Sequence, residues 1–260
     1  MFVDRCYTYL YIFDFYNLFL FDIDEHNNLA DSIFIFTIYV KFVLQTGSSE
    51  DIVINVNPVN VPYSLLNLSV LWKNLLAISI KTFTHSNVKE LPKEALKFND
   101  TAELFRRNNK IKSGVNLNIT LIWKNCANVE LIMRGAAYQP IFWEANLVRF
   151  LTRIGPEEFR FERNKNHEIR LASESALDIC YQINKNKELS NKQALIKELS
   201  DLLGKGNYFC GAWNPTICDV AVYSLLKQLQ TDEFTKKVAI PQNLNDLQKR
   251  FNETVIKMYY

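Results

Sequence analysis

The chain has 260 residues, of which 48% are hydrophobic and 22% are charged, and its formal net charge is +2. This composition is typical of a globular protein of one or two domains and excludes a disordered, collagen-like or coiled-coil chain. It also excludes a polycation, so contact with nucleic acid would need a local basic patch. Three histidines leave little material for a metal site, and five cysteines without a CxxC pair indicate free thiols in a reducing compartment.

Residues 1–45 differ in composition from the rest of the chain. They hold eight phenylalanines and five tyrosines, with six acidic and two basic side chains. Asp14, Asp22 and Asp24 interrupt the apolar runs, whereas a membrane-spanning helix needs roughly 20 apolar residues. No basic start precedes an apolar run, as it would in a signal peptide. We interpret this segment as a gene-model artefact, that is, translated A/T-rich non-coding sequence, and a membrane-proximal anchor is the alternative.

Strand and helix patterns alternate after residue 46. Alternating β-branched residues predict strands over 51–57 and 77–83, and leucines between them predict a helix of about 14 residues after Pro62. Two strands joined through a helix are expected to be parallel. Residues 87–114 are polar and basic and predict a short helix followed by a loop.

The next pattern predicts two strands and a helix. Strands are expected over 117–124 and 129–133, separated by a turn of hairpin length at 125–128. Trp143, Leu147, Phe150 and their apolar neighbours predict a helix that ends at Gly155. The element order up to this point is βαβ, a variable segment, then ββα, which is the order of a thioredoxin-like domain.

Helical patterns dominate the remainder of the chain. Apolar stripes with helical spacing lie over 169–183, 192–203, 217–230 and 244–257. The expected fold is therefore α/β followed by all-α, with a thioredoxin-like βαβ-ββα domain at 46–155 and a helical domain at 156–260. That combination is the architecture of the glutathione S-transferases.

The sharpest local motif starts the helix over 217–230. Thr216 lies three residues before Asp219, just ahead of an apolar run, which is the spacing of a capping box. Pro215 and Val220 occupy the positions of a hydrophobic staple around it. We therefore interpret Asp219 as a folding residue and not as a catalytic one.

A glutathione-dependent enzyme needs elements that are missing or degraded here. Tyr63 and Ser64 are the only hydroxyl candidates near the end of the first strand, and they fall inside the following helix. No proline stands before the strand at 117, and the acid–serine pair expected at the next helix start is Glu144-Ala145. We predict that the chain is not an enzyme; an active glutathione-dependent transferase that uses Tyr63 or Ser64 is the alternative.

Other candidate features favour structural interpretations. The basic stretch at 93–112 could contact RNA phosphates, but it lacks regular aromatic interleaving, so a solvated face is favoured. The four tryptophans sit among apolar residues and are assigned to core or interface, and two cysteines near the capping box are assigned to buried apolar positions. These residues are Trp72, Trp123, Trp143, Trp213, Cys210 and Cys218.

Several blocks of sequence resemble one known family, that of aminoacyl-tRNA synthetase complex-interacting multifunctional protein 2. The resemblance covers about residues 51–258. Its blocks are DIVINVNP at 51–58, SLL at 64–66, THSNVK at 84–89, LIWKN at 121–125, NLVRFL at 146–151, LGK at 203–205 and DVAV at 219–222. The first and third blocks are the most specific.

The resemblance implies a non-catalytic scaffold of the cytosolic multi-aminoacyl-tRNA synthetase complex that supports translation, without cofactor, metal or membrane. Its transferase-like domain would bind glutamyl-prolyl-tRNA synthetase and aspartyl-tRNA synthetase, with tRNA as an indirect partner only. The location implied is the cytoplasm and also the nucleus. Part of the family's pairing surface corresponds to residues 141–154, so Trp143 and Arg149 are predicted partner contacts.

One departure from the family concerns the N-terminal segment. Family members carry a polar N-terminal peptide that binds lysyl-tRNA synthetase, followed by a heptad-bearing segment. Residues 1–45 show neither pattern. Binding of lysyl-tRNA synthetase is therefore not carried over to this chain.

Overall fold

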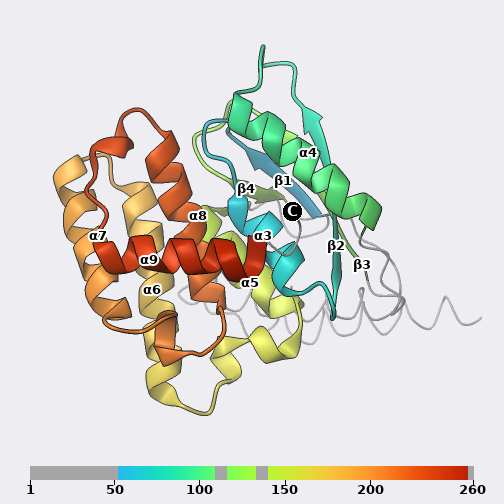
Figure 1. Cartoon of the computed structure of the whole chain (residues 1–260). Coiled ribbons are helices and arrows are strands. Elements are labelled where there is room, and N and C mark those ends of the chain that lie inside the picture. The colour runs from blue at the N-terminus through green and yellow to red at the C-terminus, as the bar shows by residue number, and fades with distance from the viewer. Residues whose placement is uncertain (1–51, 109–115, 133–139, 257–260) are drawn as a thin grey trace, which may run out of the picture. The chain divides into compact units, whose positions relative to one another are not determined.

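The computed structural model of the chain describes residues 52–108, 116–132 and 140–256 (Figure 1). All of these residues belong to one compact unit, Val40–Tyr260. The interpretation of residues 1–45 therefore lies outside the described residues. The expected boundary at residue 155 falls inside the unit and stays a prediction.

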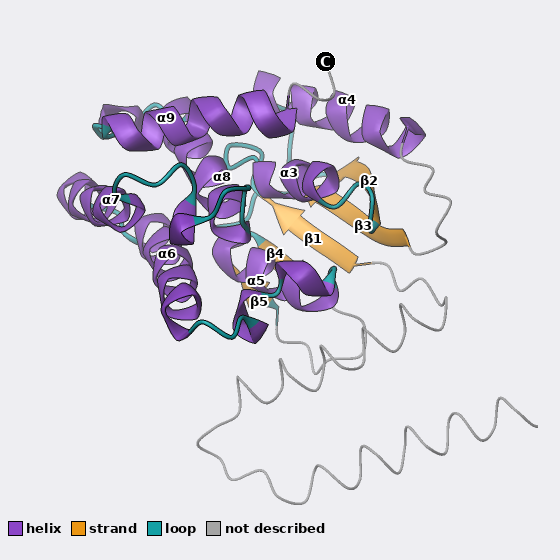
Figure 2. Ribbon diagram, turned by 60° about the horizontal axis from the view of Figure 1, so that its bottom comes forward, coloured by secondary structure: helices purple, strands orange, loops and turns teal. Residues whose placement is uncertain are grey.

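A mixed sheet of five strands forms the first half of the unit (Figure 2). The strands are β1 (Ile52–Val56), β2 (Ala77–Thr84), β3 (Asn116–Trp123), β4 (Glu130–Ile132) and β5 (Ile141–Phe142). Their order across the sheet is β2-β3-β1-β4-β5. The central strand β1 is parallel to β3 and antiparallel to β4.

The core of the sheet follows from the apolar composition of β1. Ile54 pairs with Leu121 of β3 on one side and with Leu131 of β4 on the other. All three side chains are fully buried. A strand that is hydrogen-bonded on both edges and covered by helices needs such a predominantly apolar sequence.

The predicted hairpin between the third and fourth strands is wrong. β1 lies between β3 and β4, so the turn at 125–128 passes across the end of β1 instead of joining neighbours. Neighbouring strands lie about 4.8 Å apart, so a short connection can step over one strand. The Asn57 side chain supports the crossing by donating a hydrogen bond to the Cys126 carbonyl at 2.9 Å. The expectation that the first two strands are parallel is confirmed, although β3 separates them.

Two helices of the first half differ in length from the prediction. Helix α3 (Tyr63–Leu71) is shorter than expected, because the chain turns after Trp72 to bring Leu76 into the core ahead of β2. Helix α4 (Lys93–Asn108) is a full helix where a short helix and a loop were predicted. Its buried side chains Ala95, Phe98, Ala102 and Phe105 repeat every three or four residues, which is the pattern of an amphipathic helix.

Helix α4 is anchored on the end of β3 by a buried tryptophan. The Trp123 indole is fully buried and donates a hydrogen bond to Asn99 Oδ1 at 2.8 Å. Its ring meets the Phe98 ring edge to face, with centroids 5.5 Å apart. The polar tip of the indole is thereby satisfied while its body fills the core.

Helices make up the described part of the second half. After α5 (Glu144–Ile154) come α6 (His167–Lys185), α7 (Leu189–Leu203), α8 (Ile217–Thr231) and α9 (Gln242–Phe251), which ends in a π-helical turn, Asn252–Ile256. Short 3-10 turns connect them at Glu157–Phe159, Phe161–Arg163, Phe209–Gly211 and Thr235–Lys237. Helix α8 is buried along most of its length and packs against α3, α5, α6 and α9. The expected order, a thioredoxin-like half followed by a helical half, is confirmed.

Gly155 closes helix α5 against the fully buried Trp72 ring, and this contact is the basis of a prediction. A Cβ atom at Gly155 would lie 2.6 Å from Trp72 Cη2 and 2.9 Å from the Leu151 carbonyl oxygen. We expect Gly155→Ala to lower the free energy of unfolding by roughly 1–3 kcal/mol in urea denaturation, because the added methyl group would crowd a fully buried ring.

The matched control is Gly155→Ala in a Trp72→Phe background. The smaller ring leaves room for the methyl group, so the cost of the glycine substitution should fall in that background. Strictly additive costs would contradict the proposed contact.

Candidate functional site

A buried carboxylate joins three helices at the centre of the unit. Glu144 is the first residue of α5 and is only 5% exposed. Its Oε1 atom accepts hydrogen bonds from the Ser64 backbone N–H at 3.2 Å, from the Ser64 hydroxyl and from the Ser224 hydroxyl at 2.6 Å. Its Oε2 atom accepts from Gln228 Nε2 at 2.6 Å. The carboxylate thus links α5 to both α3 and α8.

This network engages two of the residues on which a glutathione site would depend. Ser64 is fully buried, and its hydroxyl is directed to Glu144 rather than to an open pocket. Burial raises the pKa of Glu144 despite the four hydrogen bonds it accepts. Glu144 thus joins Ser64 of the first half to Ser224 and Gln228 of the second half.

Tyr63 is the other hydroxyl candidate, and its surroundings do not activate it. The phenol donates a hydrogen bond to Glu94 Oε2 at 3.2 Å. Burial and the neighbouring Glu94 carboxylate hold the pKa of Tyr63 well above its ordinary value. A hydroxyl with a raised pKa is a poor source of the anionic or proton-releasing chemistry that thiol activation needs. In the segment where a proline is missing, 114–117, residues 114 and 115 lie outside the described residues.

Sequence reasoning missed Ser224 and Gln228, which complete the Glu144 network from α8. Gln228 Nε2 also donates to the Val61 carbonyl at 2.9 Å, ahead of α3. The two polar residues stand four positions apart on α8, so both point to the same side of the helix. That spacing is the only local indication in the sequence that α8 faces a buried polar group.

The capping box at the start of α8 has both of its reciprocal hydrogen bonds. Thr216 Oγ1 accepts from the Asp219 N–H, and Asp219 Oδ2 accepts from the Thr216 N–H at 2.7 Å. Asp219 Oδ1 additionally accepts from the Phe209 N–H at 3.0 Å. The side chain is completely buried, and burial raises the pKa of Asp219 to about 6. Asp219 therefore also fixes the turn at Phe209–Gly211 to α8.

Trp143 precedes α5 in a conformation that non-glycine residues seldom adopt. Its φ and ψ angles are 75° and 143°. The conformation is held by a hydrogen bond from its N–H to the Val129 carbonyl at 3.0 Å and by edge-to-face contact with the Tyr181 ring of α6. Such strained positions persist only where surrounding contacts fix them, and they are concentrated at functional sites.

Arg149 lies two turns further along α5 and also contacts α6. Its guanidinium forms ion pairs with Glu174 at 3.0 Å and with Asp178 at 2.6 Å, and it bonds Asn146. The Arg149 side chain is only 12% exposed, whereas that of Asp178 is 68% exposed. The structure thus places Trp143 and Arg149 along the same α5–α6 contact, with Asp178 as the more accessible charge.

The basic stretch begins with helix α4, whose charges are largely paired. Lys97 pairs with Glu94, and Arg106 and Arg107 both pair with Glu103. These i,i+3 and i,i+4 pairs are typical of a solvent-exposed helix face. The remainder of the stretch, 109–112, lies outside the described residues.

The tryptophan and cysteine assignments are correct only in part. Trp72 and Trp123 are fully buried, but Trp213 is 90% exposed and does not belong to the core. It stands in the loop between Phe209–Gly211 and α8. Cys218 is buried as expected, whereas Cys210 is partly accessible.

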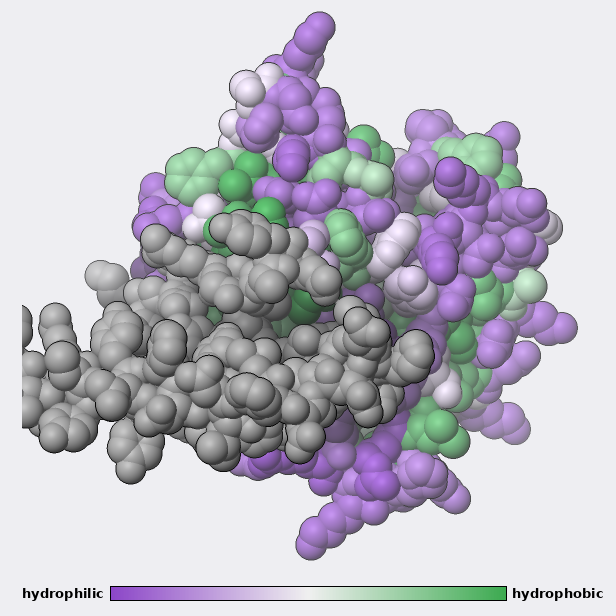
Figure 3. All heavy atoms as spheres, turned by 180° about the vertical axis from the view of Figure 1, so that it is seen from behind, coloured by the Kyte–Doolittle hydropathy of each residue, from purple (hydrophilic) through white to green (hydrophobic). Residues whose placement is uncertain are grey.

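Hydrophobic and hydrophilic residues are mixed on the accessible surface (Figure 3). Figure 3 shows one face on which hydrophobic residues are scattered among hydrophilic ones. In the part of the chain that the structure describes, no group of three or more histidine, cysteine or acidic side chains could hold a metal ion. Over the same residues, every helix is too short or too polar to cross a membrane.

The chain is similar in sequence to a known domain family and to known proteins. A family model described as a thioredoxin-like domain matches residues 47–142. The probable aminoacyl tRNA synthase complex-interacting multifunctional protein 2 of Drosophila melanogaster is 38% identical over 178 residues, which cover 68% of this chain and 51% of the relative. The Homo sapiens protein of the same name is 31% identical over 185 residues, 70% of this chain and 54% of the relative.

The chain belongs to the family of aminoacyl tRNA synthase complex-interacting multifunctional protein 2. The resemblance drawn from short sequence blocks is thereby confirmed. This member of the complex-interacting family spans about half the length of the curated relatives it matches. As the relatives' names state, those proteins interact with the aminoacyl tRNA synthase complex.

Proposed function

We propose that this chain is a non-catalytic scaffold subunit of the multi-aminoacyl-tRNA synthetase complex and supports translation by holding synthetases together. The observation that carries the proposal is its identity to relatives named for interaction with that complex. The engaged states of Ser64, Glu144 and Tyr63 support the absence of catalysis, because none is free to activate a thiol.

The proposed partners are glutamyl-prolyl-tRNA synthetase and aspartyl-tRNA synthetase, bound through the glutathione S-transferase-like part of the chain. Lysyl-tRNA synthetase is left out, since its binding peptide is not recognisable at 1–45. The proposed location is the cytoplasm, where synthetases work, and also the nucleus. Contact with tRNA is indirect, which agrees with the paired charges of α4.

We assign partner binding to the α5–α6 face, defined by Trp143, Arg149, Asp178, Tyr181 and Lys185. An aromatic pair lies in this face: Trp143 meets Tyr181 edge to face, and the Lys185 ammonium lies 5.6 Å from the centre of the Tyr181 ring. Aromatic and arginine side chains are the residue types that dominate protein interfaces. In this proposal Arg149 positions Asp178, and Asp178 contacts the partner.

The test is size-exclusion chromatography with light scattering on the full chain mixed with the transferase-like domain of glutamyl-prolyl-tRNA synthetase. A co-eluting complex is expected. Asp178→Arg should weaken its affinity about tenfold or more, because the reversed charge repels Arg149 and disturbs the accessible edge of the face.

Asp201→Arg makes the same charge change on exposed α7 and should leave binding unchanged. Equal effects of the two variants would contradict the assignment of the face. Separate elution of the unaltered chain from both proposed synthetases would overturn the scaffold proposal itself. Retention on immobilised glutathione with conjugating activity would instead favour an enzyme.

A further inference from the structure

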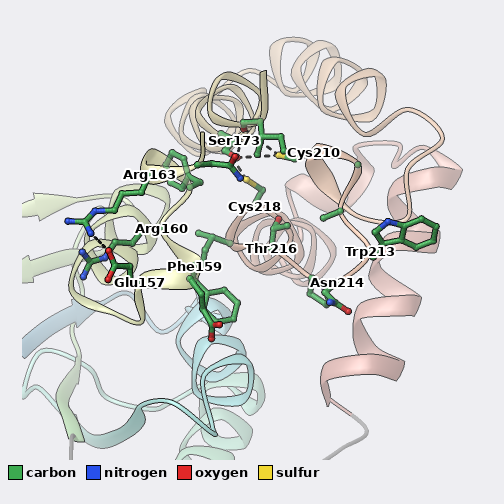
Figure 4. Close-up of a pocket in the computed structure, with 18 residues that line it drawn as sticks. Glu157, Phe159, Arg160, Arg163, Ser173, Cys210, Trp213, Asn214, Thr216 and Cys218 are labelled. Carbon is green, nitrogen blue, oxygen red and sulfur yellow. Dashed lines mark hydrogen bonds and ion pairs between the residues drawn. The ribbon is translucent and has the colours of Figure 1, made fainter. Parts of the chain in front are cut away.

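A cavity of about 720 Å³ opens between the start of α6 and the loop that leads into α8. Figure 4 shows that Cys210, Ser173 and Cys218 gather at one end of its wall, while Trp213 stands apart at the other side. The proposed scaffold function uses none of these residues. Two of the chain's five cysteines thus meet at a single accessible cavity.

The backbone at Cys210 places this thiol on the cavity wall. Cys210 has a φ angle of 62°, in the left-handed region, and Gly211 follows with a φ of 64°. The Cys210 sulfur lies 3.2 Å from the Ser173 hydroxyl and 3.8 Å from the Ile169 carbonyl oxygen of α6. A left-handed non-glycine residue costs roughly 1 kcal/mol or more, so this thiol is held in place by its surroundings.

Cys218 reaches the same spot from the first turn of α8. It is 1% exposed, and its thiol contacts the Ser173 carbonyl oxygen at 3.6 Å. A hydrogen bond with the Cys218 thiol, assisted by Ser173, lowers the pKa of Cys210 to about 7. The same interaction and burial raise the pKa of Cys218. The two pKa shifts therefore favour ionisation of Cys210 over ionisation of Cys218.

We propose that Cys210 and Cys218 form a reversible disulfide when a peroxide enters this cavity. The Cys210 thiolate attacks one peroxide oxygen, the O–O bond breaks, and the product is a sulfenic acid with hydroxide, which takes up a proton as water. The Cys218 sulfur then attacks the sulfenic sulfur, the S–O bond breaks, and a second water leaves. The two thiols lose two electrons to the peroxide, and a dithiol reductant restores them.

The two cysteines divide the chemistry according to their access. Cys210 is the attacking thiol, because it lines the cavity and is the more accessible of the two thiols. Cys218 needs no access to solvent, since it meets the oxidised sulfur within the protein. The closed ring spans residues 210–218 and includes the exposed Trp213, so oxidation would fix this loop to the capped end of α8.

The experiment treats the reduced full chain with hydrogen peroxide at pH 7, blocks remaining thiols with iodoacetamide, and measures intact mass and tryptic peptides. Oxidation alone should remove about 2 Da and protect two of the five thiols from alkylation. The tryptic map should join Cys210 to Cys218, and dithiothreitol should reverse the change.

Four variants complete the test. Cys210→Ser and Cys218→Ser should each abolish the mass loss, whereas Cys180→Ser should leave it intact, because burial raises the pKa of Cys180 to about 12. Without peroxide, the pH midpoint for alkylation of Cys210 should lie near 7 and should rise in Cys218→Ala. Irreversible sulfinic acid at Cys210 with Cys218 still free, or a disulfide that uses another cysteine, would overturn the proposal.

Discussion

Replacement of Glu144 by alanine should lower the free energy of unfolding by roughly 3–5 kcal/mol, measured by urea denaturation. The substitution leaves the Ser64 N–H, the Ser64 and Ser224 hydroxyls and the Gln228 amide without their common acceptor. It also opens a cavity at a position that is only 5% exposed. Buried donors without acceptors are among the most costly defects in a folded protein.

Two controls separate this network from a general effect of removing a carboxylate. Glu174→Ala removes an acid whose side chain is 40% exposed, and it should cost less than about 1 kcal/mol. Glu144→Gln keeps the shape and one acceptor oxygen, so its cost should fall between those of the two alanine variants. If Glu144→Ala proved as mild as Glu174→Ala, the network would not stabilise the fold.

Replacement of Asp219 by alanine should cost roughly 3 kcal/mol, because it removes one half of the capping box and the acceptor for the Phe209 N–H together. The helix α8 that it caps packs against four other helices, so fraying at this end should disturb the whole second half. Urea denaturation of the variant and of Thr216→Ala, which removes only the hydroxyl partner and should cost about 1 kcal/mol, provides the comparison.

Asp219 also predicts a dependence of stability on pH. Burial raises its folded-state pKa from 3.8 to about 6, so between these values the folded chain holds a proton that the unfolded chain has lost. The contribution of this group to stability is therefore present below pH 4 and is lost as pH rises through about 6. The full loss corresponds to up to about 3 kcal/mol.

Comparison with Asp219→Asn isolates this contribution. The variant cannot titrate at residue 219. When the free energy of unfolding at pH 4.5 is subtracted from that at pH 7.5, the result should therefore be more positive in the variant than in the unaltered chain. An unchanged difference, or one of opposite sign, would show that Asp219 is fully ionised when folded. Glu144 contributes in the same direction, because burial raises its pKa too.

The sequence patterns predicted the fold where local periodicity reports burial directly. The alternating residues of β1 and the apolar stripe of α8 were sufficient to place both elements. Helix α4 was underpredicted because its charged residues outnumber the four buried ones that define its inner side. The position of β1 between β3 and β4 depends on pairing between distant segments, which a four-residue turn does not reveal.

The candidate site was predictable only in its local parts. The Thr216–Asp219 pair is contained within four residues, so its spacing alone specified the capping box. The partners of Glu144 come from Ser64 and Ser224, each 80 residues away, and no pattern in the sequence joins them. Trp213 was assigned to core or interface, and its exposure excludes only the core, because an aromatic residue beside a cap can face inward or outward.

The Glu144 network also affects how the protein unfolds. Its donors belong to α3 and α8, and Gln228 ties the segment ahead of α3 to α8 as well. If either half unfolded, buried polar groups in the other would lose their hydrogen-bond partners. The two halves should therefore unfold in one cooperative transition despite their different architectures. Cleavage of the chain near residue 155 would then give two fragments that are unstable on their own. The boundary between the two architectures would not separate two independent folding units.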